Sequence, residues 1–571
     1  MAVALFPGLA VLSGVGCQPG APPSGPAKGT LPVRDPVVPA FREIAAAAGI
    51  RYRHETGAFG RKLLPETMGS GCAFLDYDGD GLEDVLLLSG SSFPGQAPRE
   101  AIPVQLYRNR GEARFEDASA ASGIAAGSAG AYAMGVAAAD VDNDGDADVL
   151  VTCLGADLFF ENLGNGTFRE RASELGLADD GFGSSAAWLD ANGDGLLDLF
   201  VGNYVTWTVD TDIYCSMDGK TKSYCTPESY APARCRFHLG RPGLSFQDAT
   251  ESSGVGKPPA KALGVATLDA DGDGLLDLAV ANDTLPNFLF RSKGDGTFDE
   301  IGATAGIALS ESGAARGAMG IDAADYDGSG RSSLVIGNFS RQMLSLYRNE
   351  GNGTFVDVAA RGEVGRTSLL ILTFPCFFAD VNLDGWPDIF AGNGHVEPQI
   401  ASVQKEIGYA EPPLLYVNGG GGTLREAASS AGPDLARPIV ARGGAWGDPD
   451  GDGDPDILIT CSGGPALLFQ NGLDRPERAV TLLLQGTKSN RDAIGARVSW
   501  TVGGTRHALS VSGGGSYLSQ SSRRLLLGVG PAGSADQVSV RWPSGLTEDL
   551  GSLRGGQHVR AIEGSGARSL P

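Results

Sequence analysis

The sequence predicts an all-β chain, in which a seven-bladed β-propeller is followed by a small antiparallel β-domain. Three observations predict this fold. An aspartate-rich loop of nine residues occurs seven times, at intervals of 50 to 79 residues, which suits a four-stranded blade with variable loops. A β-rich run follows most copies, and an aromatic strand, a Gly turn and a Phe-led segment come later. Beyond the last loop, the segment after residue 475 alternates apolar and polar residues.

The aspartate-rich loops begin at residues 76, 140, 190, 269, 325, 380 and 448, and their spacing suits a hard divalent cation. Side-chain oxygens occupy loop positions 1, 3, 5 and 9, position 7 offers a backbone carbonyl, and Gly at position 6 permits the sharp turn. Calcium binds about six to eight oxygen ligands of this kind. The sequence therefore predicts Ca²⁺ at about six sites. The predicted ligands are Asp76, Asp78, Asp80, Leu82, Asp84, Asp140, Asp142, Asp144, Asp146, Asp148, Asp190, Asn192, Asp194, Leu196, Asp198, Asp269, Asp271, Asp273, Leu275, Asp277, Asp380, Asn382, Asp384, Trp386, Asp388, Asp448, Asp450, Asp452, Asp454 and Asp456.

The loops differ in charge. In the fifth loop Ser329 replaces the acid at position 5 and Ser333 the acid at position 9, so we expect the site at Asp325 to be weak or empty. Asn192 and Asn382 retain an oxygen at position 3 but remove a charge. We therefore expect the third and sixth loops to bind less tightly than the first, second, fourth and seventh.

An EF-hand is the competing explanation for these loops. An EF-hand has Glu at position 12 and a helix on each side. Here position 12 is apolar in every intact loop, and a β-rich run follows. The sequence therefore predicts loops that join two strands.

The ends of the repeat array predict how the ring closes. The seventh repeat ends at residues 467–472 with no Phe-led segment after it, and a spare copy, FREIAAAAGI, occupies residues 41–50. We expect residues 41–50 to supply the missing strand of the last blade, because closure removes two exposed sheet edges.

The charge of the chain limits its partners. The formal net charge is −24, and 27 of the 68 acidic residues lie in the seven loops. The acidity is therefore mainly ligand chemistry. No basic stripe is present, and a negative chain repels phosphate, which excludes nucleic acid as a partner.

Residues 1–17 form a short apolar run ending at Cys17, which resembles the hydrophobic part of a bacterial lipoprotein signal. No Lys or Arg precedes the run, so a disordered apolar tail is the alternative interpretation. We favour export, because extracellular calcium concentrations would fill the loops. The predicted location is extracytoplasmic, whether secreted, periplasmic or envelope-anchored, and a lipid anchor at Cys17 is the only membrane attachment indicated. Residues 18–38 are rich in Pro, Gly and Ala, which predicts a flexible linker.

Two sets of segments resemble known families. The loops, together with LYRNEGNGTF at residues 346–355, resemble the FG-GAP or VCBS repeats of integrin-α-type propellers. SNRDAIGARV at 489–498, GGGSYLSQSS at 513–522 and VSVRWPSG at 538–545 resemble the ASPIC/UnbV domain that follows such propellers in the cartilage-acidic-protein-like family. The resemblance implies calcium binding and an extracellular or envelope location, and it implies no established reaction. The predicted domains are a propeller at 39–473, with an insertion at 205–240, and an ASPIC/UnbV domain at 475–563.

The most distinctive residues of the C-terminal segment are Tyr517, Trp542 and Arg491. They could form a ligand-binding face, but we expect them to pack inside the small β-domain.

Candidate catalytic residues are few. Of the five His residues, His54 and His395 lie in segments expected to form loops on one face of the ring. Two interpretations stay open: an acid–base or metal site at the propeller channel, or hydrogen bonds that order loops. No GxSxG, HExxH or GxxxxGK[ST] motif is present. We therefore expect a calcium-binding module for adhesion or for binding a protein or glycan, and no enzyme. An enzyme with its site at the channel and a structural scaffold of an envelope assembly are the alternatives.

The Cys residues fall into two sets. Equivalent blade positions predict buried, small apolar side chains at Cys72, Cys153, Cys376 and Cys461, with disulfides between blades as the alternative. The insertion carries Cys215, Cys225 and Cys235, and we expect two of these to pair, with Cys215–Cys225 preferred. We also expect the insertion to be a protein-contact surface, through Trp207, Tyr214, Tyr224 and Tyr230.

Overall fold

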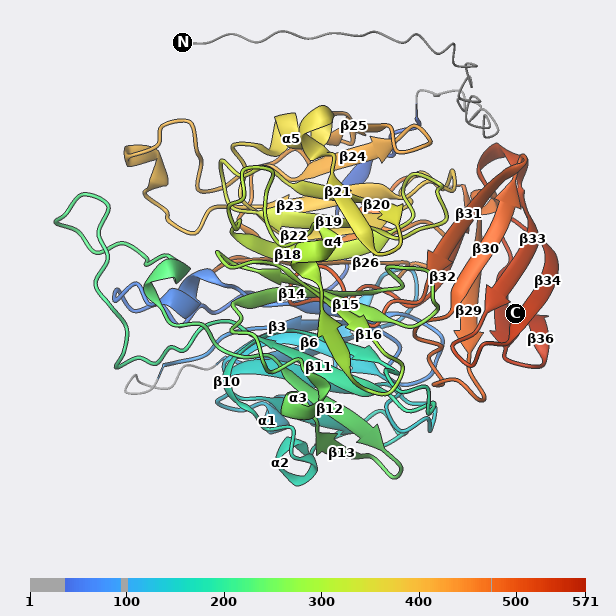
Figure 1. Cartoon of the computed structure of the whole chain (residues 1–571), viewed down its shortest axis with the longest axis horizontal. Helices are drawn as coiled ribbons and strands as arrows, with labels where there is room; N and C mark the ends of the chain where they lie inside the picture. Colours follow the sequence, from blue (N-terminus) through green and yellow to red (C-terminus); the bar gives the residue numbers. More distant parts are fainter. Residues whose placement is uncertain (1–35, 94–100, 474, 571) are drawn as a thin grey trace, which may run out of the picture. The chain divides into compact units, whose positions relative to one another are not determined.

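The computed structural model of the chain describes residues 36–93, 101–473 and 475–570 (Figure 1). The predicted all-β propeller-like fold is confirmed, because the α-helices of the described residues are segments of only four to six residues. The signal-like residues 1–17 and nearly all of the predicted linker at 18–38 lie outside the described residues. Within the described ranges, no helix has the length and apolar character needed to cross a membrane.

The propeller strands form five sheets of four strands and one sheet of eight. Each group of four is an antiparallel meander, and an aspartate-rich loop joins its first strand to its second. The strands are β1 (Phe41–Glu43); β2 (Cys72–Leu75), β3 (Asp84–Leu88), β4 (Val104–Asn109), β5 (Phe115–Asp117); β6 (Ala133–Ala139), β7 (Asp148–Ala156), β8 (Leu158–Asn162), β9 (Phe168–Glu170); β10 (Asp180–Leu189), β11 (Asp198–Asn203), β12 (Arg236–Arg241), β13 (Ser245–Asp248); β14 (Ala262–Leu268), β15 (Asp277–Asn282), β16 (Phe288–Ser292), β17 (Phe298–Glu300); β18 (Ala318–Ala324), β19 (Ser333–Asn338), β20 (Ser345–Gly351), β21 (Thr354–Asp357); β22 (Thr373–Ala379), β23 (Asp388–Asn393), β24 (Leu414–Asn418), β25 (Leu424–Glu426); β26 (Ala441–Gly447), β27 (Asp456–Cys461) and β28 (Ala466–Asn471).

The eight-stranded sheet joins two of the predicted blades. The end of β7 pairs with the start of β10, so that Ala156 lies opposite Asp180 and Leu154 opposite Phe182. Because this pairing merges two strand groups into one sheet, the number of sheets does not give the number of blades. The number seven therefore stays a prediction.

Closure of the ring by the spare N-terminal segment is confirmed. β1 adds to the outer edge of the last sheet, with Phe41 opposite Asn471 and Glu43 opposite Phe469. The Phe41 N–H also donates to the Ala431 carbonyl at 2.7 Å. The last group thus gains its fourth strand from the start of the described chain.

A repeated glycine explains how neighbouring strand groups approach. Short helices such as α4 (Gly302–Ala305) follow the outer strands, and Gly306 comes next with a φ of +88°. A Cβ on Gly306 would lie 2.7 Å from the Phe355 carbonyl oxygen of the next group, and one on Gly49 would lie 2.3 Å from the Phe115 oxygen. Only glycine permits both this backbone conformation and this contact.

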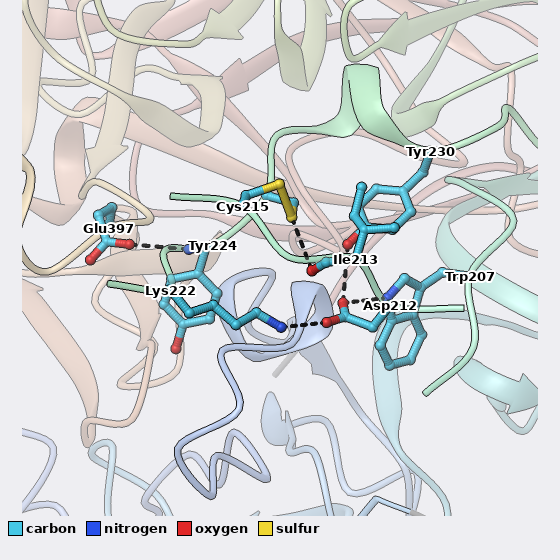
Figure 2. Close-up of a disulfide and its surroundings, with 9 residues drawn as sticks. Trp207, Asp212, Ile213, Cys215, Lys222, Tyr224, Tyr230 and Glu397 are labelled. Carbon is cyan, nitrogen blue, oxygen red and sulfur yellow. Dashed lines mark hydrogen bonds and ion pairs between the residues drawn. A yellow bond between two sulfur atoms is a disulfide. The ribbon is translucent and has the colours of Figure 1, made fainter. Parts of the chain in front are cut away.

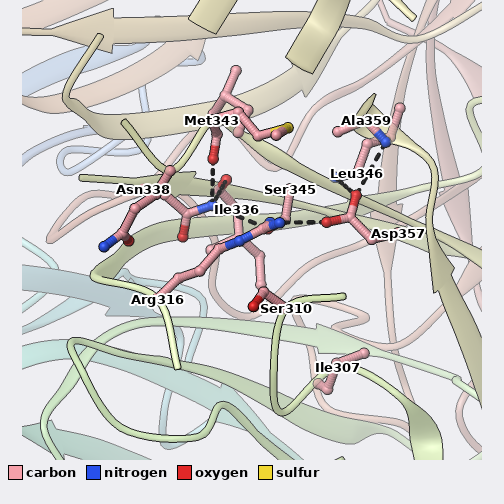
Figure 3. A network of polar contacts seen from close by, with 12 residues as sticks. Ile307, Ser310, Arg316, Ile336, Asn338, Met343, Ser345, Leu346, Asp357 and Ala359 are labelled. Carbon is pink, nitrogen blue, oxygen red and sulfur yellow. Dashed lines mark hydrogen bonds and ion pairs between the residues drawn. The ribbon is translucent and has the colours of Figure 1, made fainter. Parts of the chain in front are cut away.

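The group formed by β18–β21 has a polar network at the end opposite its aspartate-rich loop (Figure 3). Arg316 forms a half-buried ion pair with Asp357 at 2.8 Å. The other Asp357 oxygen accepts the Leu346 N–H at 3.2 Å and the Ala359 N–H at 3.0 Å. Asn338 donates to the Met343 carbonyl at 2.7 Å. These bonds tie the start of the group to its third and fourth strands.

The C-terminal domain consists of two four-stranded sheets. Their strands are β29 (Ala479–Gln485), β30 (Arg497–Val502), β31 (Thr505–Ser510), β32 (Leu525–Gly528), β33 (Ser534–Arg541), β34 (Thr547–Arg554), β35 (His558–Ile562) and β36 (Gly566–Ser569). The prediction of a purely antiparallel domain is wrong, because β29 and β35 pair in parallel. The two ends of the domain meet in this pair.

The C-terminal domain and the propeller share one hydrophobic cluster, which includes Trp188 of β10 and Trp542 of the domain. The expectation that Tyr517 and Arg491 pack inside the domain is wrong. The Tyr517 ring lies 4.9 Å from the ring of Phe374 in β22. The Arg491 side chain extends to the second loop, where its Nε lies 3.3 Å from Asp140 Oδ2.

Candidate metal centres

The aspartate-rich loops are shaped by hydrogen bonds from their own backbone. In the first loop the Gly81 N–H donates to Asp76 Oδ2 at 2.9 Å, and the Leu82 N–H donates to Asp80 Oδ1 at 3.0 Å. In the fourth loop the Gly274 N–H makes the equivalent bond to Asp269 Oδ2 at 3.0 Å. These turns use one oxygen of each carboxylate.

In every loop other than the fifth, the acid at position 9 anchors the loop to its strand group. In the first loop Asp84 Oδ2 accepts the Tyr77 N–H at 3.1 Å, and Oδ1 accepts the Asn109 N–H of the third strand at 2.7 Å. The same paired bonds are made by Asp148, Asp198, Asp277 and Asp388. The fifth loop keeps one of them, because Ser333 Oγ accepts the Asn349 N–H at 3.1 Å. Position 9 is therefore a fold-determining position as well as a predicted ligand.

Several loop oxygens are buried without a hydrogen-bond donor among the described residues. They are Oδ1 of Asp76, Asp78, Asp140 and Asp448, and Oδ2 of Asp456. In four loops three carboxylates each offer an oxygen within 4.8 Å of the others, among the residues described. These groups are Asp76, Asp78 and Asp84; Asp140, Asp142 and Asp144; Asp269, Asp271 and Asp273; and Asp448, Asp450 and Asp452. Buried acceptors without donors fit a divalent cation that prefers oxygen ligands.

The electrostatics of the loops favour a cation in the same way. Burial raises the pKa of Asp84 to about 8. Burial, and then the Asp492 carboxylate, raises the pKa of Asp140 to about 7. Burial, and then Glu83, raises the pKa of Asp448 to about 8. Each ionised carboxylate is thus destabilised by lost hydration and by like charge, and a bound cation would offset both.

The three deviant loops keep the same shape. Asn192 Oδ1 accepts the Asp194 N–H at 3.1 Å. Asn382 Nδ2 donates outward to the Val37 carbonyl at 3.1 Å, which leaves its oxygen in the loop. In the fifth loop Asp325 Oδ1 is buried without a donor among the described residues. The order of affinities among the loops stays a prediction.

An asparagine in the third strand links neighbouring loops, and the sequence analysis missed this role. Asn109 Nδ2 donates to the Glu83 carbonyl of its own loop at 2.9 Å and to the Pro449 carbonyl of the seventh loop at 2.6 Å. Asn162, Asn349, Asn418 and Asn471 each make the same pair of bonds, to their own loop and to the preceding one. The signal was present as the Asn of the repeated aromatic-Asn segment, but its partners are distant in sequence.

Two family models match the chain. The model for ASPIC and UnbV matches residues 486–568, and the model for the FG-GAP-like repeat matches residues 71–151 and 269–336. The chain contains FG-GAP-like repeats and an ASPIC/UnbV domain. It is homologous to "Cartilage acidic protein 1" of Xenopus tropicalis, with 25% identity over 438 residues that cover 72% of this chain and 61% of the relative. For the Homo sapiens protein of that name, identity is 24% over 440 residues, covering 72% and 60%.

The chain spans about three fifths of the length of these curated relatives. A solved structure described as "YCF48 bound to D1 peptide" matches with 9% identity and a TM-score of 0.38, and the match covers 76% of this chain and 99% of that one.

At the FG-GAP-like propeller's other loop face, His54 and His395 are buried, with 4% and 3% of their surface exposed. Each Nδ1 accepts a backbone N–H at 3.1 Å, from Gly463 and from Glu397 respectively. Burial, and then the charge of Arg442, lowers the pKa of His54 to about 3 and that of His395 to about 4. Both imidazoles are therefore neutral near pH 7. Because Nδ1 accepts a hydrogen bond, the proton is assigned to Nε2, which in each ring is buried without a partner among the described residues. These bonds agree with the loop-ordering interpretation.

We expect these two histidines to make the FG-GAP-like propeller sensitive to acid. In the unfolded chain each imidazole takes a proton below its ordinary pKa, whereas the folded chain does so only near pH 3–4. Stability is therefore full above about pH 6.5 and falls progressively below it, by about 2 kcal/mol per histidine at pH 5. The fall in Tm between pH 7 and pH 5 should be smaller in the His54→Gln/His395→Gln variant than in the wild type. Calorimetry in saturating calcium measures it. The half-buried His558→Gln control should change the fall less, and an equal fall in all three proteins would contradict the prediction.

The predicted Cys215–Cys225 disulfide is confirmed, and Cys72, Cys153, Cys235, Cys376 and Cys461 are buried free thiols. The expectation that all four aromatic residues of the insertion form a contact surface is wrong. Trp207 and Tyr230 are each only 7% exposed, and both donate to Asp212 Oδ1 at 3.0 Å (Figure 2). They anchor the insertion from inside.

Tyr224 lies beside the disulfide (Figure 2) and attaches the insertion to two other loops. Its hydroxyl donates to Glu66 Oε2 at 2.8 Å, and its N–H donates to Glu397 Oε2 at 3.2 Å. Lys62 completes this contact through an ion pair with Glu397 at 2.9 Å. Only Tyr214 of the four aromatic residues is exposed, with 64% of its surface accessible. β12 begins at Arg236, inside the segment predicted as the insertion.

Proposed function

We propose that the chain is a calcium-loaded, extracytoplasmic binding module that contacts a protein through the tip of its disulfide-pinned insertion. The observation that carries the binding role is the tip itself. Ile213, Tyr214 and Met217 are 38%, 64% and 39% exposed, beside a disulfide. Three large apolar side chains within five residues, on an otherwise anchored loop, suit recognition of a protein.

Rigidity of the tip supports this assignment. The disulfide closes the loop. Asp212, at the base of the loop, forms an ion pair with Lys222 at 2.6 Å and also accepts the hydrogen bonds from Trp207 and Tyr230 (Figure 2). Tyr224 fixes the far end of the loop. Because the loop is ordered before it binds, less conformational entropy is lost on association.

Calcium is the cation that the loops suit best. Their predicted ligands are carboxylate, amide and carbonyl oxygens, and no sulfur or imidazole is present in the loops. When bound, the ion neutralises the clustered carboxylates of each loop. The chain's own contribution is to hold the turns in shape through Gly N–H groups and through the acid at position 9. Neighbouring loops share asparagine bonds, so ordering one loop also orders the next.

An extracytoplasmic location is supported by the disulfide, since such bonds persist in oxidising compartments. The free thiols of the propeller are buried and do not compete for it. Calcium loading agrees with the same location.

A catalytic role for His54 and His395 is the rival proposal. Both imidazoles are buried, and their Nδ1 atoms are engaged by backbone N–H groups. We therefore propose that they order loops and that the chain acts by binding.

The binding proposal is tested by saturation binding of the labelled full chain to its native envelope preparation. We expect the Ile213→Ser/Tyr214→Ser/Met217→Ser variant to bind at least about tenfold more weakly, which is the effect of losing a central apolar contact. Protease treatment of the envelope should abolish the binding of the wild type.

The matched control is Leu163→Ser/Val356→Ser, which removes two apolar side chains that are 48% and 39% exposed elsewhere on the propeller. This control should bind like the wild type. Equal weakening in both variants would contradict the role of the tip. Binding that survives protease but is lost after glycosidase treatment would identify a glycan and overturn the protein partner.

A further inference from the structure

One segment of the C-terminal domain runs along the axis of the propeller. This axial segment, residues 512–522, contacts the first strand of every group. Three first strands donate to backbone carbonyls of the segment: Val136 N–H to Leu518 at 3.1 Å, Trp188 N–H to Gly513 at 3.0 Å and Ile321 N–H to Ser516 at 3.1 Å. Three contacts use a side-chain oxygen: Cys72 N–H and Gly444 N–H each donate to Ser519 Oγ at 3.1 Å, and Gly513 N–H donates to Thr267 Oγ1 at 3.1 Å. In the seventh contact the ring centres of Phe374 and Tyr517 are 4.9 Å apart. A single stretch of chain thus holds β2, β6, β10, β14, β18, β22 and β26.

The axial segment requires glycines because the first strands of the groups approach its backbone too closely to leave room for a side chain. A Cβ on Gly513 would lie 1.7 Å from the Trp188 carbonyl oxygen, and one on Gly515 would lie 2.8 Å from Asp322 Oδ1. From the other side, a Cβ on Gly71 would lie 1.6 Å from the Leu518 oxygen. The run GGGSYLSQSS is therefore a fitted element of the propeller interior.

The body of the same domain rests on the aspartate-rich loops. Arg524 Nη2 donates to the Gly81 carbonyl of the first loop at 2.6 Å. In the second loop the Asp140 N–H donates to Asp492 Oδ2 at 2.8 Å, and Arg491 lies 3.3 Å from Asp140 Oδ2. These contacts leave Asp140 Oδ1 as the buried oxygen without a donor among the described residues.

The contacts continue around the ring. Arg541 Nη1 lies 3.9 Å from Asp269 Oδ2 of the fourth loop, and Arg497 Nη2 donates to the Gly330 carbonyl of the fifth at 2.8 Å. In the sixth loop the Leu383 carbonyl accepts the Gly530 N–H at 2.8 Å. Glu83, in the first loop, accepts a hydrogen bond from the Ser522 hydroxyl of the axial segment. It also accepts the Asp448 N–H of the seventh loop, at 2.7 Å.

We propose that the ASPIC/UnbV domain positions the cation loops from outside, with the axial segment as its latch, so that cation binding and docking of this domain depend on each other. The inference rests on the proposed calcium loading. Arg491, Arg541, Asp492 and Arg524 are positioning residues, because they contact one side of a loop whose remaining carboxylate oxygens would face the cation. Coupling between two binding events is reciprocal: whatever the cation adds to docking, docking adds to cation affinity.

The test compares the full chain with a Gly513→Ala variant. Calorimetric titration of calcium into the chelator-treated proteins measures affinity and stoichiometry. Gly513 is far along the chain from every loop, and the substitution forces its Cβ against the Trp188 oxygen, two residues before the third loop. We expect calcium affinity to fall about tenfold, within the common range of coupling between sites. The matched control is Gly362→Ala, where a Cβ meets nothing within 4 Å and φ is −126°, and it should bind calcium like the wild type.

Two further measurements keep the proposal falsifiable if Gly513→Ala does not fold. Tyr517→Phe removes only the hydroxyl that donates to the Met68 carbonyl at 3.0 Å, and it should weaken calcium binding a few-fold. In the wild type, chelation should speed amide exchange at Gly513 and Gln520. Calcium affinity unchanged in both variants, or exchange indifferent to calcium, would overturn the coupling while calcium loading stands. A wild-type chain that binds no calcium would overturn both proposals.

Discussion

Removing calcium is expected to lower the Tm of the full chain by about 15 °C. A ligand that binds only the folded form adds about 2.7 kcal/mol per site when its free concentration is a hundred times its Kd. The summed free energy from about six such sites, divided by an unfolding entropy of roughly 2 cal/mol/K per residue, gives a Tm shift of this size. The shift should be read by calorimetry before and after exhaustive chelation, and restored by added calcium.

Two single-loop variants give the matched comparison. Asp271→Asn alters the fourth loop, whose three carboxylates lie together, and it should weaken one site and lower the Tm by a few degrees. Asp327→Asn makes the same change in the fifth loop and should leave both calcium content and Tm unchanged. An unaltered Tm after chelation, with no calcium found by elemental analysis, would contradict the metal sites altogether.

The loops and the ring closure could be predicted because their signals are local and repeated. Asp–Gly spacing specifies a turn wherever it occurs, and Phe41 repeats a pattern found in the later outer strands. The Cys215–Cys225 pair likewise follows from the short separation of these two residues within one insertion. In each case neighbouring residues carry most of the information.

The place of the C-terminal domain could not be predicted, because its contacts join residues hundreds of positions apart. GGGSYLSQSS has no period of its own, and its glycines are required by oxygens of Trp188 on β10 and Asp322 on β18. The prediction that the aromatic residues of the insertion form a contact surface was wrong for a related reason. Composition indicated a contact surface, whereas the position of Asp212 turned Trp207 and Tyr230 inward. The Asn109 amide was visible in the repeat, but its second acceptor, Pro449, lies across the ring closure.

Replacement of Arg442 by Met is expected to destabilise the chain by more than about 4 kcal/mol. Arg442 is 1% exposed, and its guanidinium donates to the Thr67 carbonyl at 2.6 Å and to the Ala441 carbonyl at 2.6 Å. It also reaches the Gly394 and His395 carbonyls at 3.1 and 3.2 Å. Methionine fills similar space but leaves four buried carbonyl oxygens without this donor, at about 1–3 kcal/mol for each oxygen that finds no other.

The surroundings of Arg442 leave little room for repair. Its guanidinium carbon lies 4.0 Å from the centre of the Phe374 ring, and a Cβ on Gly69 would meet its Cγ at 2.2 Å. Urea unfolding in saturating calcium, followed by far-UV circular dichroism, should show a lower midpoint for Arg442→Met. The exposed Arg361→Met should keep the wild-type midpoint. Because the Tyr517 ring packs on the same Phe374, loss of Arg442 should also loosen the middle of the axial segment. A shift below about 1 kcal/mol would mean that water or a rearranged loop supplies the missing donors, and that Arg442 does not hold this face together.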